Sequence, residues 1–180
     1  MDDNKQPWIL AGYDLFSKEG FKGLKIEVLA RKVNKSKSSF YHYFADLDGF
    51  IESLLNYHLE RSKIIAEREK QCKIMVPDML NILLEVKQDL LFNRQLRVNR
   101  NILEFRRCFE KTDKEFENTF LDVWAETLGL ADKKYLAQIV LNQTIENFYL
   151  QITEETLTYE WLLNYIFKVR EMVNEFIKNN

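Results

Sequence analysis

Hydrophobic residues recur every three or four positions along almost the whole chain, which is the spacing of amphipathic α-helices. Near the N-terminus this pattern predicts three short helices, over residues 7–18, 26–33 and 37–43. Pro7 suits a first helical turn, and Gly20 suits the stop after the first helix. A fourth and longer helix is expected from Asp46, whose carboxylate can accept from free backbone N–H groups, to about Lys70.

The same spacing predicts five further helices, over residues 77–92, 94–109, 112–128, 133–152 and 159–177. Thr112 and Glu115 have the spacing of a capping box, in which two side chains satisfy the first backbone groups of a helix. Gly129 suits the end of that helix, and Asp132 can cap the next one. The sequence therefore predicts an all-α protein of about nine helices.

The composition agrees with this fold class. The chain has five glycines and two prolines in 180 residues, about 4%, against about 12% in an average protein. β-Sandwiches and barrels need many tight turns, and doubly wound nucleotide-binding folds need glycine-rich loops, so both are disfavoured. The aromatic content of 13% is far above that of disordered chains.

Other features bear on the compartment. Cys72 and Cys108 are too few for a disulfide framework, and free buried thiols are typical of a reducing environment. No apolar run follows a basic segment at the N-terminus, and no stretch of about 18 apolar residues occurs. We therefore expect a soluble, cytoplasmic protein with no membrane partner.

Charge is unevenly distributed along the chain. The formal net charge is −2, yet residues 18–44 carry seven basic and two acidic side chains, a local net charge of +5. Such a basic block is typical either of an ordinary solvated face or of a surface that binds anions such as nucleic-acid phosphates. The charge alone leaves both interpretations open.

The second and third short helices are joined by the polar turn 34–36, the kind of connection found in a helix-turn-helix. In that motif the second helix of the pair enters the major groove of DNA, and the first crosses the backbone. Here the reading helix would carry Lys, Ser and Tyr outwards, and Phe40 and Phe44 inwards. Those outward side chains are common donors to phosphates and base edges.

Three motifs follow one another within the first 44 residues: Leu15-Phe16-x-x-x-Gly20-Phe21, Ile26-x-x-Leu29-Ala30 and Ser36-Lys37-Ser38-Ser39-Phe40-Tyr41-His42-Tyr43-Phe44. Together they resemble the N-terminal domain of TetR-family transcriptional repressors, over about residues 8–55. Beyond residue 55 only the length and the number of helices are similar to that family.

The resemblance implies a helix-turn-helix DNA-binding domain at residues 1–46 and a helical ligand-binding and dimerisation domain at residues 47–180. It implies a homodimer that binds a palindromic operator in double-stranded DNA, by default as a repressor, and that an unidentified small molecule releases. The residues expected to contact DNA are Lys25, Lys35, Ser36, Lys37, Ser38, Ser39, Tyr41, His42 and Tyr43.

The chain departs from the family pattern at several positions of this domain. Leu24 and Lys25 stand where the family has Thr-Ser or Thr-Thr, so Leu24 supplies neither a helix cap nor a phosphate contact. Lys35 replaces an apolar residue, and Leu47 replaces a lysine that contacts phosphate. Asn34 replaces a glycine, although Asn tolerates the left-handed conformation. The alternative hypothesis is therefore a helical dimeric sensor or interaction protein with weakened DNA binding.

Apolar residues of the second domain are candidates for its two expected roles. Those that could line a ligand cavity are Phe92, Phe105, Phe109, Trp124, Phe148 and Tyr149. Those expected at a dimer interface, on the last two helices, are Tyr135, Ile139, Trp161, Tyr165, Ile166, Val169 and Val173. Both sets have the alternative of packing only in the core of their own chain.

The remaining polar residues point to no catalytic chemistry. Five arginines between residues 94 and 107 could bind an anionic ligand or pair with Glu104, Glu110 and Glu115 on a solvated face. The two histidines, His42 and His58, have no metal-binding spacing, and no catalytic triad order, phosphate loop or paired-carboxylate motif stands out. We therefore expect no enzymatic activity, no metal and no cofactor.

Overall fold

The computed structural model describes residues 4–178 and folds them into nine α-helices, with no strand among those residues. The helices are α1 (Gln6–Glu19), α2 (Ile26–Lys32), α3 (Lys37–Tyr43), α4 (Leu47–Glu69), α5 (Leu80–Glu85), α6 (Lys87–Val98), α7 (Leu103–Leu128), α8 (Lys134–Gln151) and α9 (Tyr159–Lys178). Three short helical turns are η1 (Phe21–Gly23), η2 (Met75–Met79) and η3 (Ala131–Lys133). The predicted all-α class is confirmed. Within the described residues, no helix has the length and apolar character needed to cross a membrane.

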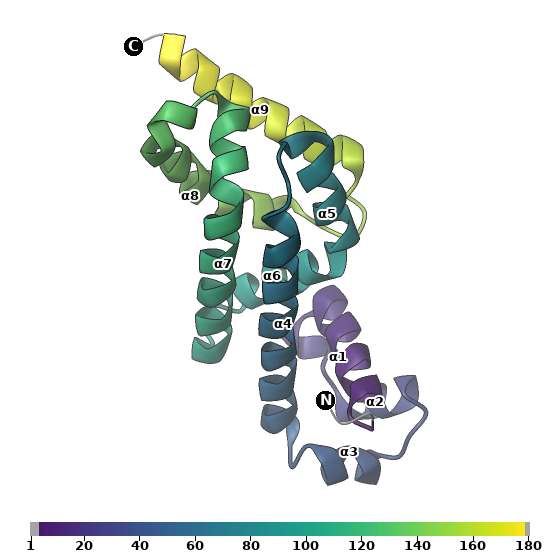
Figure 1. Cartoon of the computed structure of the whole chain (residues 1–180). Helices are drawn as coiled ribbons and strands as arrows, with labels where there is room; N and C mark the ends of the chain where they lie inside the picture. Colours follow the sequence, from purple (N-terminus) through teal and green to yellow (C-terminus); the bar gives the residue numbers. More distant parts are fainter. Residues whose placement is uncertain (1–3, 179–180) are drawn as a thin grey trace.

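The helices form an elongated molecule with distinct ends (Figure 1). We call α1, α2 and α3 the head, which lies at one end, and α4 to α9 the body, in which α9 lies across the opposite end. Helix α4 leaves the head and packs along α7, while α1 packs against α6. Helix α8 packs against α7, and α9 packs against both α5 and α7. Helix α4 therefore links α3 directly to the middle of the body.

Short-range signals in the sequence set the turns of the head. Gly20 ends α1 at φ 70°, and its N–H donates to the carbonyl oxygen of Phe16. Asn34, in the turn between α2 and α3, has φ 53°, so it adopts the left-handed conformation that was expected of it. Asp46 caps α4, because its Oδ1 accepts from the N–H of Gly49 at 2.8 Å. All three sequence predictions are confirmed.

The buried core does not separate the head from the body. One hydrophobic cluster joins Trp8 and Phe16 of α1 and Phe40 of α3 to Phe92 of α6. Within it the ring of Tyr13 stacks on Phe92, with ring centroids 4.2 Å apart. The other cluster lies among α5, α7, α8 and α9. Since one core spans both parts, the head is packed onto the body and not merely attached through α4.

Two predicted helix caps in the body are wrong, and so is the predicted helix over residues 94–109, which spans the end of α6 and the start of α7. Helix α7 is unbroken through Thr112, whose hydroxyl donates to the carbonyl oxygen of Phe109 at 2.9 Å, so no capping box operates there. The break lies earlier, between the end of α6 and Leu103. Asp132 does not cap α8, because α8 begins at Lys134 after η3 and no side chain caps its N-terminus.

The predicted helix over residues 77–92 is divided. The turn η2 contains Val76 in an extended conformation, α5 follows it, and Val86 at φ −96° and ψ 22° separates α5 from α6. The apolar spacing continues across these interruptions, which is why periodicity alone did not locate them.

Gly20 has φ 70° and ψ −165°, a conformation that is essentially restricted to glycine. We expect Gly20→Ala to lower the free energy of unfolding by about 1–3 kcal/mol. Gly49→Ala is the matched control, because Gly49 has no positive φ and the nearest atom to an added Cβ, Asp46 Oδ1, lies 3.5 Å away. Urea unfolding of the full chain measures both variants, and equal destabilisation by the two would contradict this account.

Candidate nucleic-acid interface and buried cavities

Helix α3 has one buried and one exposed side. Phe40 is fully buried and Phe44 nearly so; Phe40 packs against Trp8 of α1, and both pack against Phe50 of α4. Lys37 and His42 are exposed, and Tyr41 has 53% of its surface exposed. The short helix therefore presents donor groups to solvent on a hydrophobic backing.

The serine before α3 caps the first turn of this helix. Ser36 is the N-cap, and its hydroxyl accepts from the N–H of Ser39 at 3.2 Å. The Ser36 hydroxyl also lies 3.0 Å from that of Ser38. Ser36 and Ser38 are exposed, and Ser39 is half-buried. The cap fixes where the exposed end of α3 begins.

Acidic neighbours neutralise part of the basic block. Lys18 and Lys32 both pair with Asp14, at 2.8 and 3.2 Å. Lys37 pairs with Glu27 of α2, and this hydrogen bond holds the pKa of the Glu27 carboxyl below its usual value. Among residues 4–178, the basic side chains of the block that make no ion pair are Lys22, Lys25, Arg31 and Lys35. These four cations leave the surface able to attract phosphate.

The remaining predicted DNA contacts and the departures from the family pattern have distinct places. Lys25 is exposed at the start of α2, where no side chain caps the helix. The Lys35 ammonium lies 5.9 Å from the ring centroid of the half-buried Tyr43. Leu24 is buried in the core of the head, and Leu47 is half-buried at the first position of α4. Neither leucine presents a polar group to DNA.

A buried polar network joins the head to the body. The hydroxyl of Tyr13 on α1 donates to Asp89 Oδ1 of α6 at 2.8 Å and lies 2.6 Å from His58 Nδ1 of α4. Arg61 of α4 donates two hydrogen bonds to Asp89, from Nε to Oδ1 at 2.9 Å and from Nη2 to Oδ2 at 2.6 Å. Three helices therefore meet at one carboxylate, and only α1 among them belongs to the head.

The hydrogen bonds of this network define the state of His58. Because the Tyr13 proton goes to Asp89, we assign the donor in the Tyr13–His58 contact to His58 Nδ1. Burial lowers the pKa of His58 to about 4, so the ring is neutral at pH 7. Its Nε2 is then an acceptor, and that atom is buried without a partner in the described chain.

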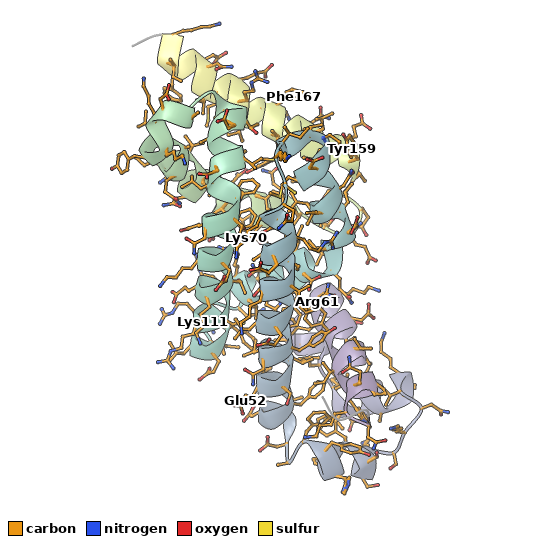
Figure 2. All side chains as sticks on the ribbon, in the orientation of Figure 1. Glu52, Arg61, Lys70, Lys111, Tyr159 and Phe167 are labelled. Atoms are coloured by element: carbon orange, nitrogen blue, oxygen red, sulfur yellow. The ribbon has the colours of Figure 1, made fainter. Side chains whose placement is uncertain are left out.

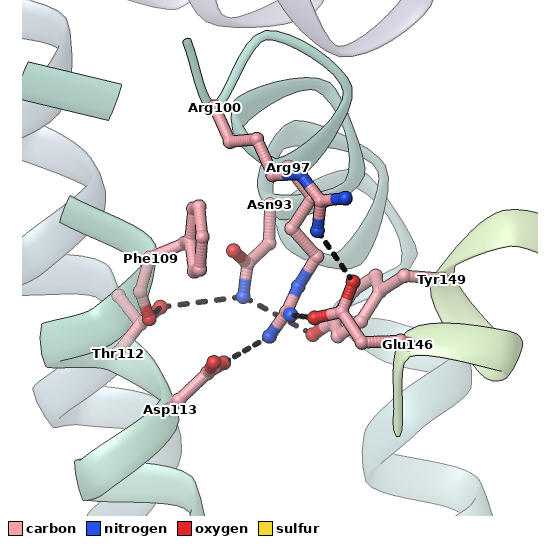
Figure 3. A network of polar contacts seen from close by, with 8 residues as sticks. All are labelled: Asn93, Arg97, Arg100, Phe109, Thr112, Asp113, Glu146 and Tyr149. Atoms are coloured by element: carbon pink, nitrogen blue, oxygen red, sulfur yellow. Dashed lines mark hydrogen bonds and ion pairs between the residues drawn. The ribbon is translucent and has the colours of Figure 1, made fainter. Parts of the chain in front are cut away.

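A second network lies deeper in the body (Figure 3). The guanidinium of Arg97 on α6 is buried and pairs with Asp113 of α7 and Glu146 of α8. It also lies 4.8 Å from the ring centroid of Phe109 and 4.3 Å from that of Tyr149. The predicted pairing of this arginine cluster with Glu104, Glu110 and Glu115 is wrong for Arg97, whose partners come from other turns and another helix.

An apolar cavity of about 60 Å³ lies in the second core, among α5, α7, α8 and α9. Trp124, Phe148 and Tyr149, three of the aromatics predicted for a ligand cavity, line it. The other three lie elsewhere. They belong to the core that the head shares with the body, and they are Phe92, Phe105 and Phe109.

A polar cavity of similar volume adjoins the apolar one. The two share Leu90, Phe116 and Tyr149 in their walls. Among the other residues that line the polar cavity are His58, Glu69, Asp89, Asn93 and Thr112. Sequence reasoning missed this site. The signal was available in part, because His58 falls on the same helical face as Leu54 and Leu55, where an apolar residue is the rule.

The residues predicted for a dimer interface fall into three groups. Tyr135 and Ile139 on α8 are exposed, at 77% and 39% of their surface. Trp161 and Tyr165 on α9 are half-buried and stacked on each other. The remaining three are buried in the core of their own chain, and they are Ile166, Val169 and Val173. Figure 2 shows the exposed side chains along the outer side of α9, including Tyr159 and Phe167.

The neutral state of His58 makes stability depend on pH. The folded protein holds the pKa of His58 at about 4 against 6.5 ordinarily, so the unfolded chain binds more protons between these values. The resulting stability is present above pH 6.5 and is lost as the pH falls to 4, at a cost of about 3 kcal/mol. We expect His58→Gln to flatten the pH dependence of the free energy of unfolding in this window, and His42→Gln to preserve it. A His58→Gln profile as steep as that of the unsubstituted protein would contradict the assignment.

Comparison with known proteins bears on the head and on the whole fold separately. Residues 9–54 match the family model described as bacterial regulatory proteins, tetR family. No curated protein matches the chain. Two solved structures, both described as TetR-family transcriptional regulators, share the fold at low sequence identity. One, from Mesorhizobium loti, has 15% identity and a TM-score of 0.57, with 94% of each chain covered. The other, from a Rhodococcus species, has 16% identity and a TM-score of 0.52, with 99% of this chain and 98% of that chain covered.

The residues that match the family model include α3, which carries the exposed donor side chains. They also include α2, the turn at Asn34 and the start of α4. A domain of this family implies DNA-binding transcriptional regulation and not catalysis. The predicted resemblance is therefore confirmed: residues 9–54 of this chain match the tetR family of bacterial regulatory proteins.

Proposed function

We propose that this protein is a ligand-responsive repressor that binds a palindromic operator as a homodimer and is released by a small molecule. The observation that carries the proposal is the arrangement of α3 and α4. Helix α3 exposes donor side chains, and α4 begins directly after it and reaches the polar cavity of the body through His58 and Glu69.

In the proposed complex α3 enters the major groove. Lys37 exchanges Glu27 for a phosphate, and Tyr41, which is exposed beside it, donates to the backbone or a base edge. Lys25 and Lys35 need no such exchange, because each lacks an ion-pair partner in the described residues. Non-specific attraction therefore comes chiefly from the unpaired cations, and α3 supplies orientation.

The dimer is proposed to form through α8 and α9. Tyr135, Leu136 and Ile139 expose apolar surface on one part of α8, and Phe167 and Met172 do so on α9. Exposed apolar residues on neighbouring helices favour an interface with a second copy. Ile166, Val169 and Val173 contribute by holding α9 in place and not by contact with the partner, because their own chain covers them.

Release is proposed to follow a shift between two arrangements of the head on the body. A ligand beside His58 contacts a residue that is already bonded to Tyr13 of the head. If that ligand favours a different position of His58, the Tyr13 contact and the angle of α1 change with it. The spacing of the two reading helices in a dimer then no longer matches the operator.

Binding to double-stranded DNA that flanks the protein's own gene, titrated with salt, tests the function. We expect affinity to fall steeply as salt rises, because phosphate contacts release counterions. Lys37→Ala should weaken affinity by about tenfold and lower the salt slope by about 1, and Tyr41→Ala should weaken it without changing the mass of the dimer. Lys63→Ala is the matched control, since Lys63 is an exposed, ion-paired lysine of α4.

Two outcomes would refute this function. If the chain does not bind DNA even at low salt, the regulator hypothesis fails in favour of a dimeric sensor, which the buried Leu24 and half-buried Leu47 would then explain. If Lys37→Ala and Tyr41→Ala both bind as well as Lys63→Ala, the contact surface is not α3.

A further inference from the structure

Two of the residues that line the polar cavity carry a buried acceptor atom that lacks a donor. His58 Nε2 is buried and unpartnered, and its neutral ring makes it an acceptor. Asn93 Oδ1 is also buried without a partner in the described residues. Buried acceptors of this kind are costly unless something donates to them.

The orientation of the Asn93 amide is fixed by its neighbours. The Thr112 hydroxyl donates its proton to the carbonyl oxygen of Phe109. It can therefore only accept a hydrogen bond from Asn93. Asn93 Nδ2 therefore faces Thr112 at 3.3 Å and the hydroxyl of Tyr149 at 3.1 Å, as Figure 3 shows. The side-chain atom of Asn93 without a hydrogen-bond partner is therefore the oxygen Oδ1, which can only accept from a donor.

A buried carboxyl completes this set. Glu69 has 3% of its surface exposed, and within the described part of the chain its carboxyl accepts one hydrogen bond, from the Thr119 hydroxyl at 2.7 Å to Oε2. No cation pairs with Glu69 among residues 4–178, whereas Arg61 neutralises Asp89 in the same wall. Burial accordingly raises the pKa of the Glu69 carboxyl. A positively charged group in this cavity could form an ion pair with the Glu69 carboxylate, which has no cationic partner among the described residues.

The adjoining apolar cavity can take the rest of such a ligand. Phe116 and Phe120 stack with ring centroids 4.4 Å apart in its wall, and Trp124 lies beside them. Leu90, Phe116 and Tyr149 belong to both cavities, so the two compartments are neighbours across these side chains. One molecule with a polar and an apolar part would therefore contact both.

We propose that the effector is an apolar molecule that carries a protonated amine. Its ammonium group pairs with the Glu69 carboxylate, and its apolar body lies against Phe116, Phe120 and Trp124. This assignment of ligand class rests on the proposed function, since it takes the cavity to be the site through which DNA binding is regulated.

Calorimetric titration of the full chain at pH 7 with three probes of similar shape tests the ligand class. The probes are 2-phenylethylammonium, the neutral 2-phenylethanol and the anionic 3-phenylpropionate. We expect the ammonium to bind at least about tenfold more tightly than the alcohol, and the anion to bind most weakly. Glu69→Gln should abolish this order, because the amide keeps the shape and an acceptor for Thr119 without the charge.

Glu67→Gln is the matched control, because Glu67 is exposed two residues away on α4 and pairs with Lys70. It should keep the order of the three probes. The proposal is overturned if the alcohol binds as tightly as the ammonium, if Glu69→Gln keeps the preference, or if none of the probes binds. Binding of the ammonium by a chain that does not bind DNA would support the ligand class and refute the proposed function, so the two failures are distinguishable.

Discussion

The hydrogen bond between Tyr13 and Asp89 holds the head in a defined position on the body. Asp89 is buried, so its negative charge needs a counter-charge and hydrogen-bond donors within the protein. Arg61 supplies the charge, and both Arg61 and Tyr13 donate hydrogen bonds. The arginine lies on α4 and the tyrosine on α1, so satisfying one carboxylate sets the relative position of three helices. The aromatic core around Phe92 then packs at that position. Packing supplies most of the buried area, and the polar contact selects one arrangement.

The same contact gives the body a way to act on the head. His58 bonds to Tyr13 on one side of its ring and lines the polar cavity of the body. In the proposed mechanism, a cavity occupant that displaces the His58 ring also displaces the contact of that ring with Tyr13. Because α4 also begins next to α3, the proposed movement of His58 would be transmitted along one continuous helix. The proposed effector site and α3 therefore need no long chain of intermediate contacts.

The sequence allowed the head to be predicted far better than the body, and the reason is the range of the interactions. The turns at Gly20, Asn34 and Asp46 depend on one residue and its near neighbours. The outward side of α3 likewise follows from the spacing of its two phenylalanines. In the body, Thr112 has a local capping signal that the continuous packing of α7 overrides.

Apart from the position of His58 on an apolar helical face, the buried sites could not be predicted from the sequence, for the same reason. Tyr13 lies 45 residues from His58 and 76 residues from Asp89, and no periodicity links such positions. In the sequence, Glu69 and Asn93 have the spacing of ordinary polar residues of amphipathic helices. Only the fold shows that both line the polar cavity. Likewise, three of the six predicted cavity aromatics lie in the other core, since spacing shows that a residue is buried but not which neighbours it meets.

The most direct test of this account is the ratio of DNA affinities measured without and with saturating 2-phenylethylammonium, compared between Tyr13→Phe and Tyr57→Phe. Tyr57 packs edge-on against Tyr13, at 5.1 Å between ring centroids, but takes no part in the Asp89 contact, which makes it the matched control. We predict that the ligand weakens DNA binding by about tenfold in the unsubstituted protein and in Tyr57→Phe. In Tyr13→Phe the ratio should fall to about 1, although the variant still binds DNA and ligand separately. A ratio in Tyr13→Phe equal to that of the unsubstituted protein would contradict the claim that this contact couples the head to the body.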